Sequence, residues 1–303
     1  MIAVALAVIG ATAVGIVCER RVGGARTLAQ RMLTLMLYVL VPFVSFVSIA
    51  QLRVTIAGAV GLVFAFLAMA ATGLVAWAAG RRVLRLSDSR LGAVICAVVV
   101  ANTGSLGYPM TVALLHAGAL PSAVAYDQIV NGPALFLVAF GVGAAFGSVA
   151  TSARARYRSF LTRNPPLLAV LAGLVAPASL APAPLPAISR VLVVGMLLAG
   201  FYVVGVYLSS ERREDHAPLL ERPDRPVLLA LGLRLLIAPA ILLGLSVVFV
   251  RVPNAYVLES AMPTGINSLI VGHSYGLDQQ LIATIIVWST LAVLIGGLVG
   301  AVL

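Results

Sequence analysis

Long apolar runs separated by short polar connections dominate the chain. A run of about 20 predominantly apolar residues is long enough to cross the hydrocarbon core of a bilayer as an α-helix. We draw ten such runs along the sequence and expect each to form one membrane-spanning helix. The predicted spans lie at about residues 2–18, 32–50, 56–79, 92–115, 122–147, 165–182, 187–209, 227–250, 254–274 and 280–302.

The composition places the chain outside the range of soluble proteins. Hydrophobic residues make up 61% of it, charged residues make up 10%, and the mean hydropathy is +1.10. A soluble chain carries about a quarter charged residues. The first apolar run has neither a basic segment before it nor a convincing cleavage site after it, so we interpret it as a span and not as a secretory signal. The sequence therefore predicts an all-α polytopic membrane protein.

Arginine indicates the orientation, because basic residues accumulate in cytoplasmic connections. The connections that follow spans 1, 3, 5 and 7 hold sixteen arginines, and the opposite connections hold three, at Arg53, Arg190 and Arg251. We therefore expect both termini to lie outside the cytoplasm. The formal charge of +10 is distributed along this alternation, so it indicates membrane topology and not a nucleic-acid partner.

The predicted spans divide into two halves. Five precede the basic loop at residues 150–163 and five follow it. Halves with an odd number of spans face opposite ways across the membrane, an arrangement called an inverted repeat. We predict a first five-helix repeat over residues 1–149, a cytoplasmic basic loop over 150–163 and a second five-helix repeat over 164–303. The longest polar segment, Ser209–Pro226, is too short for a soluble domain, so one integral membrane domain is expected.

Two predicted spans carry matching interruptions. The fourth contains VANTGSLGYPM (Val100–Met110), and the ninth, which is fourth in its own half, contains ESAMPTGINSLI (Glu259–Ile270). Proline removes a backbone donor and glycine permits unwound backbone, so both segments favour a broken helix. Corresponding interruptions in two halves are the best sequence indication of a transporter's binding site. The alternative is a pair of ordinary proline kinks, which membrane helices tolerate.

A broken helix exposes backbone N–H and C=O groups at bilayer depth, which is tolerated only beside a cavity or a partner. Each half-helix that begins at a break also points the positive end of its dipole inward. The fourth and ninth spans run in opposite directions, so two positive ends should converge on a site suited to an anion, especially a carboxylate. The expected substrate-binding residues are Asn102, Thr103, Gly104, Ser105, Gly107, Pro109, Pro263, Thr264, Gly265, Asn267 and Ser268.

Four stretches resemble the auxin efflux carrier family of membrane transporters, in the order in which the family has them. NTGSLGYPM (102–110) is similar to the family's Asn-Thr-Gly-x-x-Gly-x-Pro segment. LTRNPPLLAVLAGLV (161–175) is similar to its sixth span, and LMLYVLVPFVSF (35–46) is similar to its second. AMPTGINSLIVGHSYGLD (261–278), followed by WSTLAVL, is similar to its C-terminal signature.

This resemblance implies a fold and a mechanism. The family's bacterial members include malonate and other organic-acid permeases. Ten helices in two inverted five-helix repeats are implied, with helices 4 and 9 crossing at a central anion site, as in the related bile acid symporters. Alternating access, driven by membrane potential or an ion gradient, is the implied mechanism.

Two acidic residues lie within predicted spans, where charged groups are costly and indicate function by default. Asp127 lies near the outer end of the fifth span, and Glu259 lies one turn before Pro263 in the ninth. Either could carry a coupling proton, because desolvation favours a neutral carboxyl group. The alternative is an acid in contact with headgroups and water, which we favour for Asp127 and rank equally for Glu259. The coupling ion is H⁺ or Na⁺, and no metal site or other cofactor is expected.

Three further polar residues within the spans have two interpretations each. Arg234 in the eighth span could neutralise a substrate or extend its side chain to the interface, and we expect the second. Asn131 lines the site or belongs to a packing kink of the fifth span. Tyr108 lines the site or anchors its helix by packing.

The function that these features favour is secondary active transport of a small organic anion by alternating access around the crossing of helices 4 and 9. A non-transporting membrane ligand sensor with the same fold is the alternative. The sequence has no nucleotide-binding motif and no nucleophile, base and metal set for an enzyme. We expect an inner (plasma) membrane location, the lipid bilayer and a small organic anion as partners, no nucleic acid, and a homodimer by family analogy.

Overall fold

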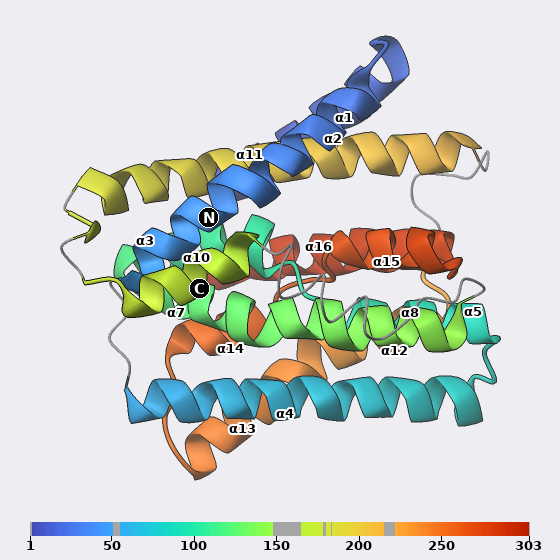
Figure 1. Ribbon diagram of the computed structural model, residues 1–303. Helices are drawn as coiled ribbons and strands as arrows, with labels where there is room; N and C mark the ends of the chain where they lie inside the picture. Colours follow the sequence, from blue (N-terminus) through green and yellow to red (C-terminus); the bar gives the residue numbers. More distant parts are fainter. Residues whose placement is uncertain are drawn as a thin grey trace.

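The computed structural model describes residues 2–50, 55–147, 165–177, 180–182, 184–214 and 222–302. The predicted basic loop 150–163 and Arg53 lie outside these ranges. Helices make up nearly all of the described chain (Figure 1). In chain order they are α1 (Ile2–Arg21), α2 (Ala25–Leu35), α3 (Val41–Ala50), α4 (Ile56–Ala78), α5 (Asp88–Val99), α6 (Tyr108–Leu114), α7 (Leu120–Tyr126), α8 (Phe140–Phe146), α10 (Pro165–Val175), α11 (Pro184–Glu214), α12 (Arg225–Leu231), α13 (Ala238–Val248), α14 (Asn254–Ser260), α15 (Asn267–Tyr275) and α16 (Gln279–Val302).

Several of these α-helices continue one another through short π-helical turns, in which backbone hydrogen bonds reach five residues back. Met36–Leu40 joins α2 to α3, and Gly232–Ile237 joins α12 to α13. Asp127–Asn131 and Ala134–Ala139 lie between α7 and α8, and Ala79–Val83 extends α4. The joined pieces form long helices, and each π turn changes the direction in which the following side chains point.

Four helices within the described residues are long and apolar enough to cross a membrane. They are Ile56–Val83, Pro184–Val206, Arg225–Val248 and Gln279–Gly296. Large apolar side chains such as Leu74, Val191 and Val247 are exposed along three of them, as expected for surfaces that face lipid. The all-helical architecture is consistent with a polytopic membrane protein. The number of ten spans and the inverted repeat stay predictions.

The ends of two long helices differ from the predicted ones. The helix that contains the second predicted span begins at Ala25 and not at residue 32. The helix of the seventh predicted span continues to Glu214, beyond residue 209. Both extensions are rich in arginine, which the hydropathy pattern assigned to connections. A helix can continue past its apolar stretch, because its own backbone hydrogen bonds remain satisfied in water.

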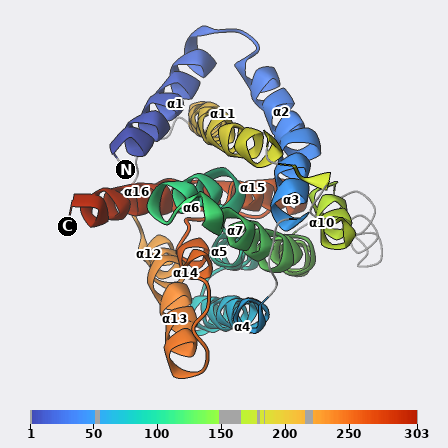
Figure 2. The same ribbon diagram turned by 90° about the vertical axis from the view of Figure 1, so that its left-hand side faces the viewer.

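The helices pack as two groups (Figure 2). A peripheral group, which consists of α1, α2, α3, α10 and α11, lies along one side of the molecule. Gly15 and Gly205 allow α1 and α11 to approach closely, since a Cβ at either position would collide with a backbone carbonyl oxygen of the other helix. The core group consists of the remaining helices, which surround the largest apolar core, around Leu91, Val98 and Ile282.

Both predicted interruptions contain breaks in the helix, and the first break is shorter than the segment predicted for it. α5 ends at Val99, and helical backbone resumes at Thr103, in the π turn that leads into α6. The unwound residues are therefore 100–102, and Pro109 lies within the first turn of α6. In the ninth span the unwound residues 261–266, between α14 and α15, contain the predicted Pro263.

Candidate functional site

The two breaks hydrogen-bond to each other. The Asn102 N–H donates to the Pro263 carbonyl at 2.8 Å, and the Gly265 N–H donates to the Val100 carbonyl at 2.9 Å. Together these bonds form an isolated antiparallel β-bridge between the two segments. Each break thereby satisfies backbone groups that the other leaves open, as apolar surroundings require.

Side chains complete the two outer edges of this bridge, whose paired residues are Ala101 and Thr264. The Asn131 side chain accepts from the Ala101 N–H at 2.9 Å and donates to the Ala101 carbonyl at 3.1 Å. On the opposite edge, the Thr264 N–H donates to Ser289 Oγ at 3.1 Å. Asn131 ends the π turn Asp127–Asn131 that follows α7, and Ser289 lies in α16, so the helix that follows each broken span supports its break.

Gly265 permits the close approach of the two backbones. A Cβ at this position would lie 2.6 Å from the Ala101 carbonyl oxygen and 2.9 Å from its carbonyl carbon. The Ala101 carbonyl is held by Asn131 and cannot retreat without breaking the bridge. The glycine is therefore needed for the space it leaves and not only for backbone freedom.

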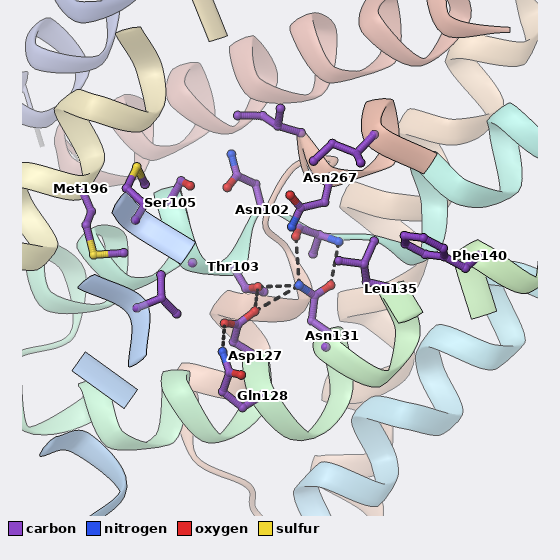
Figure 3. A pocket seen from close by; sticks show the side chains of 18 residues that line it. Asn102, Thr103, Ser105, Asp127, Gln128, Asn131, Leu135, Phe140, Met196 and Asn267 are labelled. Carbon is purple, nitrogen blue, oxygen red and sulfur yellow. Dashed lines mark hydrogen bonds between the residues drawn. The ribbon is translucent and has the colours of Figure 1, made fainter. Parts of the chain in front are cut away.

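Asp127 is the centre of a buried hydrogen-bond network (Figure 3). Its Oδ1 accepts from the Thr103 hydroxyl and, at 3.1 Å, from Asn131 Nδ2. Its Oδ2 accepts from the Tyr108 hydroxyl at 2.6 Å and from Gln128 Nε2 at 2.7 Å. Asp127 is only 8% exposed. The expectation that this carboxyl group contacts headgroups and water at the interface is therefore wrong, and all four of its donors are uncharged.

A cavity of about 280 Å³ lies beside the crossing and this network. The side chains of Asn102, Ser105 and Asn267 line it (Figure 3), and none of them has a hydrogen-bond partner within the described chain. The cavity also borders the start of two helical segments, at Thr103 and Asn267. Its wall is formed by Met36, Val41, Ala101, Asn102, Thr103, Gly104, Ser105, Asp127, Gln128, Asn131, Gly132, Leu135, Phe140, Met196, Gly265, Ile266, Asn267 and Ile270.

Glu259 lies on α14, is fully buried and does not line this cavity. The Thr111 hydroxyl donates to its Oε1 at 3.1 Å. Its Oε2 has no hydrogen-bond partner among the described residues, which is unusual for a buried oxygen. Gly107 makes room for the carboxyl group, since a Cβ there would collide with it. Of the two interpretations of Glu259, contact with headgroups and water does not fit this position.

Arg234 lies in the π turn Gly232–Ile237, is 2% exposed and does not extend to an interface. The expectation of a snorkelling side chain is therefore wrong. The side chain stays buried because of tertiary contacts. The two breaks leave backbone carbonyl groups that need hydrogen-bond donors, and the guanidinium supplies these donors. It donates to the carbonyl oxygens of Met262 at 2.9 Å, Ser260 at 3.0 Å, Val98 at 3.2 Å and Glu259 at 3.4 Å.

Comparison with known proteins identifies the class of molecule that carries this crossing. Residues 160–299 match the family described as "Membrane transport protein". An uncharacterized transporter of Methanocaldococcus jannaschii is 27% identical over 264 residues, which cover 78% of this chain and 77% of that protein. The chain is thus similar to membrane transport proteins of the auxin efflux carrier type. The resemblance stated from the sequence motifs is thereby confirmed.

In this transporter the cavity wall contains some of the site residues predicted from the sequence. It includes Asn102, Thr103, Gly104, Ser105, Gly265 and Asn267, together with Asp127 and Asn131. The wall does not include Gly107, Pro109, Pro263, Thr264, Ser268, Glu259 or Tyr108. Thr264 and Ser268 instead donate their hydroxyls to the carbonyls of Ala97 and Gly265, at 2.8 and 2.6 Å. These two residues hold the transporter's crossing together and do not reach the cavity.

Sequence reasoning missed other residues of the cavity wall. Gln128 was detectable, because it is a second polar residue beside Asp127 in an otherwise apolar stretch. The apolar ones give no signal, since an apolar side chain looks the same in sequence whether it faces lipid, a helix or a binding site. These apolar wall residues are Met36, Val41, Ala101, Leu135, Phe140, Met196, Ile266 and Ile270.

Proposed function

We propose that this transporter is a secondary active carrier of a small organic anion, a carboxylate, that works by alternating access around the crossing. The cavity beside the crossing carries the proposal, because two helical segments begin at its wall and the amides of Asn102 and Asn267 lack partners within the described chain. Side-chain amides and helix N-termini both donate hydrogen bonds to carboxylates, and the helix dipole favours negative charge.

The charges around the cavity favour an anion with a single negative charge. The described wall contains no Arg, Lys or His. Each helix N-terminus is equivalent to about +0.5 elementary charge, so two supply about +1. A dicarboxylate would add a second, uncompensated charge beside Asp127 in apolar surroundings, which is costly. Apolar walls such as Leu135, Phe140 and Met196 suit a monocarboxylate with an apolar body.

The cavity lies where the peripheral and core groups meet. Met36, Val41 and Met196 come from the peripheral side of the wall, and the crossing comes from the core group. A substrate held between two groups of helices is released when one group moves against the other. We propose this relative movement, around a crossing that stays intact, as the transport step.

The outer half of the same boundary is packed. In the predicted orientation, Leu135, Phe140 and Ile270 lie on the cytoplasmic side of the crossing and line the cavity. Residues expected on the outer side, including Val44 and Val124, belong to one buried apolar cluster. This arrangement supports an inward-facing state, in which the substrate path leads from the crossing towards the cytoplasm.

The buried charges support coupling to protons. Among the described residues, the buried acidic and basic side chains are Asp127, Glu259 and Arg234. One cation cannot balance two ionised carboxyl groups in a medium of low dielectric constant, so one carboxyl group should hold a proton. Glu259, with one oxygen unpartnered in the described chain, is our proposed carrier of that proton.

The Glu259→Gln variant tests this coupling role. It keeps the size of the side chain and removes the proton-binding site, so we expect normal protein levels together with uncoupled or abolished transport. Uptake driven by an imposed pH gradient is the measurement. Uptake and pH dependence equal to those of the wild type would contradict the coupling role of Glu259. Such a result would not contradict the proposed binding site.

Transport itself is tested in proteoliposomes with imposed pH and voltage gradients. We expect saturable uptake of [¹⁴C]pyruvate, or of another monocarboxylate, to exceed that of [¹⁴C]malonate at equal concentration. Protein-free liposomes provide the control for passive entry. Binding of carboxylates without flux would favour the alternative of a ligand sensor, and absence of both would contradict the proposal.

We also propose ten spans in an inverted repeat, both termini outside the cytoplasm, an inner-membrane location and a homodimer. Ten spans in an inverted repeat are supported by the two breaks, each completed by the helix that follows it. Both termini outside the cytoplasm and an inner-membrane location rest on the distribution of arginine. A homodimer rests on the family resemblance alone.

A further inference from the structure

Four backbone carbonyl groups converge on one guanidinium at the crossing. Val98 belongs to the last turn of α5, and Ser260 ends α14. Their carbonyl oxygens accept from the Arg234 side chain together with those of Glu259 and Met262. The Arg234 side chain, in the eighth predicted span, therefore contacts the C-terminal ends of α5 and α14, the two half-helices that stop at the crossing.

These carbonyl groups are chemically a cation site. The last carbonyl groups of a helix have no partner within the helix, and the helix dipole concentrates negative charge there. In transporters with broken helices, C-terminal ends and unwound carbonyl groups are the ligands of Na⁺. A guanidinium ion also satisfies such a site, because it carries one positive charge and five N–H donors in a planar array.

We propose that Arg234 is a permanent internal cation, which occupies the cation site formed by the ends of α5 and α14, so that the transporter binds no Na⁺ at its crossing. A bound ion can be released and can therefore drive a transport cycle, whereas a tethered guanidinium cannot leave. This consequence rests on the proposed transport function and assigns its coupling to protons or voltage. The assignment of the site itself does not depend on that function.

Arg234 does not act as a partner of the transported anion. It is absent from the cavity wall, and four of its N–H···O contacts go to backbone carbonyl groups. The remaining alternative is that Arg234 only fills space at the crossing. The two alternatives predict different behaviour of a variant that lacks the guanidinium. If the site binds a cation, addition of a small cation should restore the thermal stability of that variant, whereas if Arg234 only fills space it should not.

The first experiment uses the unaltered protein in detergent and measures its melting temperature in NaCl and in choline chloride at equal ionic strength. The site is already filled, so we expect the two melting curves to coincide over the whole range of salt concentration. A saturable increase in melting temperature that is specific to Na⁺ would overturn the proposal, because it would require a Na⁺ site beside the guanidinium or in its place.

The second experiment removes the guanidinium. We expect Arg234→Ala to lower the melting temperature by about 5 °C or more, because buried carbonyl groups lose their donors. Methylguanidinium chloride at millimolar concentration should restore much of this loss, and NaCl should restore more of it than choline chloride does. Arg90→Ala is the matched control, because the Arg90 side chain is 39% exposed and pairs with Asp224. Added methylguanidinium should therefore leave the melting temperature of this variant unchanged.

Arg234 would only fill space if methylguanidinium did not raise the melting temperature of Arg234→Ala, or if it raised the melting temperature of Arg90→Ala by the same amount. If Arg234→Ala cannot be purified, Arg234→Lys replaces it, since an ammonium keeps the charge and has three donors. We expect this variant to be less stable than the wild type and to remain indifferent to Na⁺. Stabilisation of it by Na⁺ would contradict the proposal.

The transport consequence is measured separately, as [¹⁴C]pyruvate uptake with external and internal Na⁺ replaced by choline. We expect unchanged uptake. Absence of flux with every carboxylate would contradict the proposed function and leave the stability results intact. A requirement for Na⁺ in the presence of flux would contradict the internal cation and leave the transport function intact.

Discussion

At the scale of single residues, Asn131 links the crossing to the site. Its amide pairs with both backbone groups of Ala101, and its Nδ2 also donates to Thr103 at 2.8 Å and to Asp127. One side chain thus holds the unwound backbone and the buried carboxyl group in a fixed relation. A change at this position should affect folding and the geometry of the cavity together.

The Asn131→Ala variant should be substantially less stable. It leaves the Ala101 N–H and carbonyl unpaired in a buried position, at a cost of about 1–3 kcal/mol for each group. Differential scanning fluorimetry in detergent measures the melting temperature, which we expect to fall by several degrees. Ser45→Ala is the control, because the Ser45 hydroxyl is buried without a hydrogen-bond partner in the described chain. Equal melting temperatures of the two variants would contradict the role of Asn131.

Asn102→Ala and Asn267→Ala should behave in the opposite way. Neither side chain has a hydrogen-bond partner within the described chain, so their removal should change the melting temperature little. Both line the cavity, and we expect each substitution to raise the KM for carboxylate uptake about tenfold, as for the loss of one hydrogen bond to a charged group. Unchanged KM values in both variants would mean that neither amide binds the substrate.

At the scale of elements, the sequence indicates that two spans break but not how the breaks are completed. The polar and proline-containing segments are recognisable, yet the unwound residues 100–102 contain neither glycine nor proline. π turns at Asp127 and Arg234 have no sequence signal, because they depend on how neighbouring helices pack. The prediction that these two residues lie at the interface was wrong for the same reason, because their hydrogen-bond partners come from other spans.

Gly265→Ala tests the close contact of the two broken elements. The new Cβ would overlap the Ala101 carbonyl, so we expect the bridge to separate and the protein to lose several degrees of thermal stability or fail to accumulate. Gly244→Ala in α13 is the matched control. No atom lies within 4 Å of a Cβ built at Gly244, and alanine favours a helix over glycine by about 1 kcal/mol. A neutral Gly265→Ala variant would contradict the bridge.

At the scale of the whole molecule, the packed outer boundary and the open cavity support the proposed inward-facing state. With Cys18 and Cys96 replaced by Ser, we expect Asn267→Cys to react with a membrane-impermeant maleimide in inside-out vesicles and not in intact cells. Arg251→Cys, on an exposed connection predicted to lie outside, should show the reverse pattern. Labelling of both positions from the same side would contradict the inward-facing state or the predicted orientation.

The β-bridge also has a consequence for the origin of the chain. Each broken helix closes its hydrogen bonds with the backbone of the other, so a single half would leave buried polar groups open wherever it was inserted. On the proposed inverted repeat, a five-helix ancestor could have avoided this cost only by pairing with a copy of itself in the opposite orientation. Residues 1–149 and 164–303, produced as separate chains, should therefore accumulate only when they are made together. Fusion of the halves would have turned an assembly between two molecules into one within a single chain.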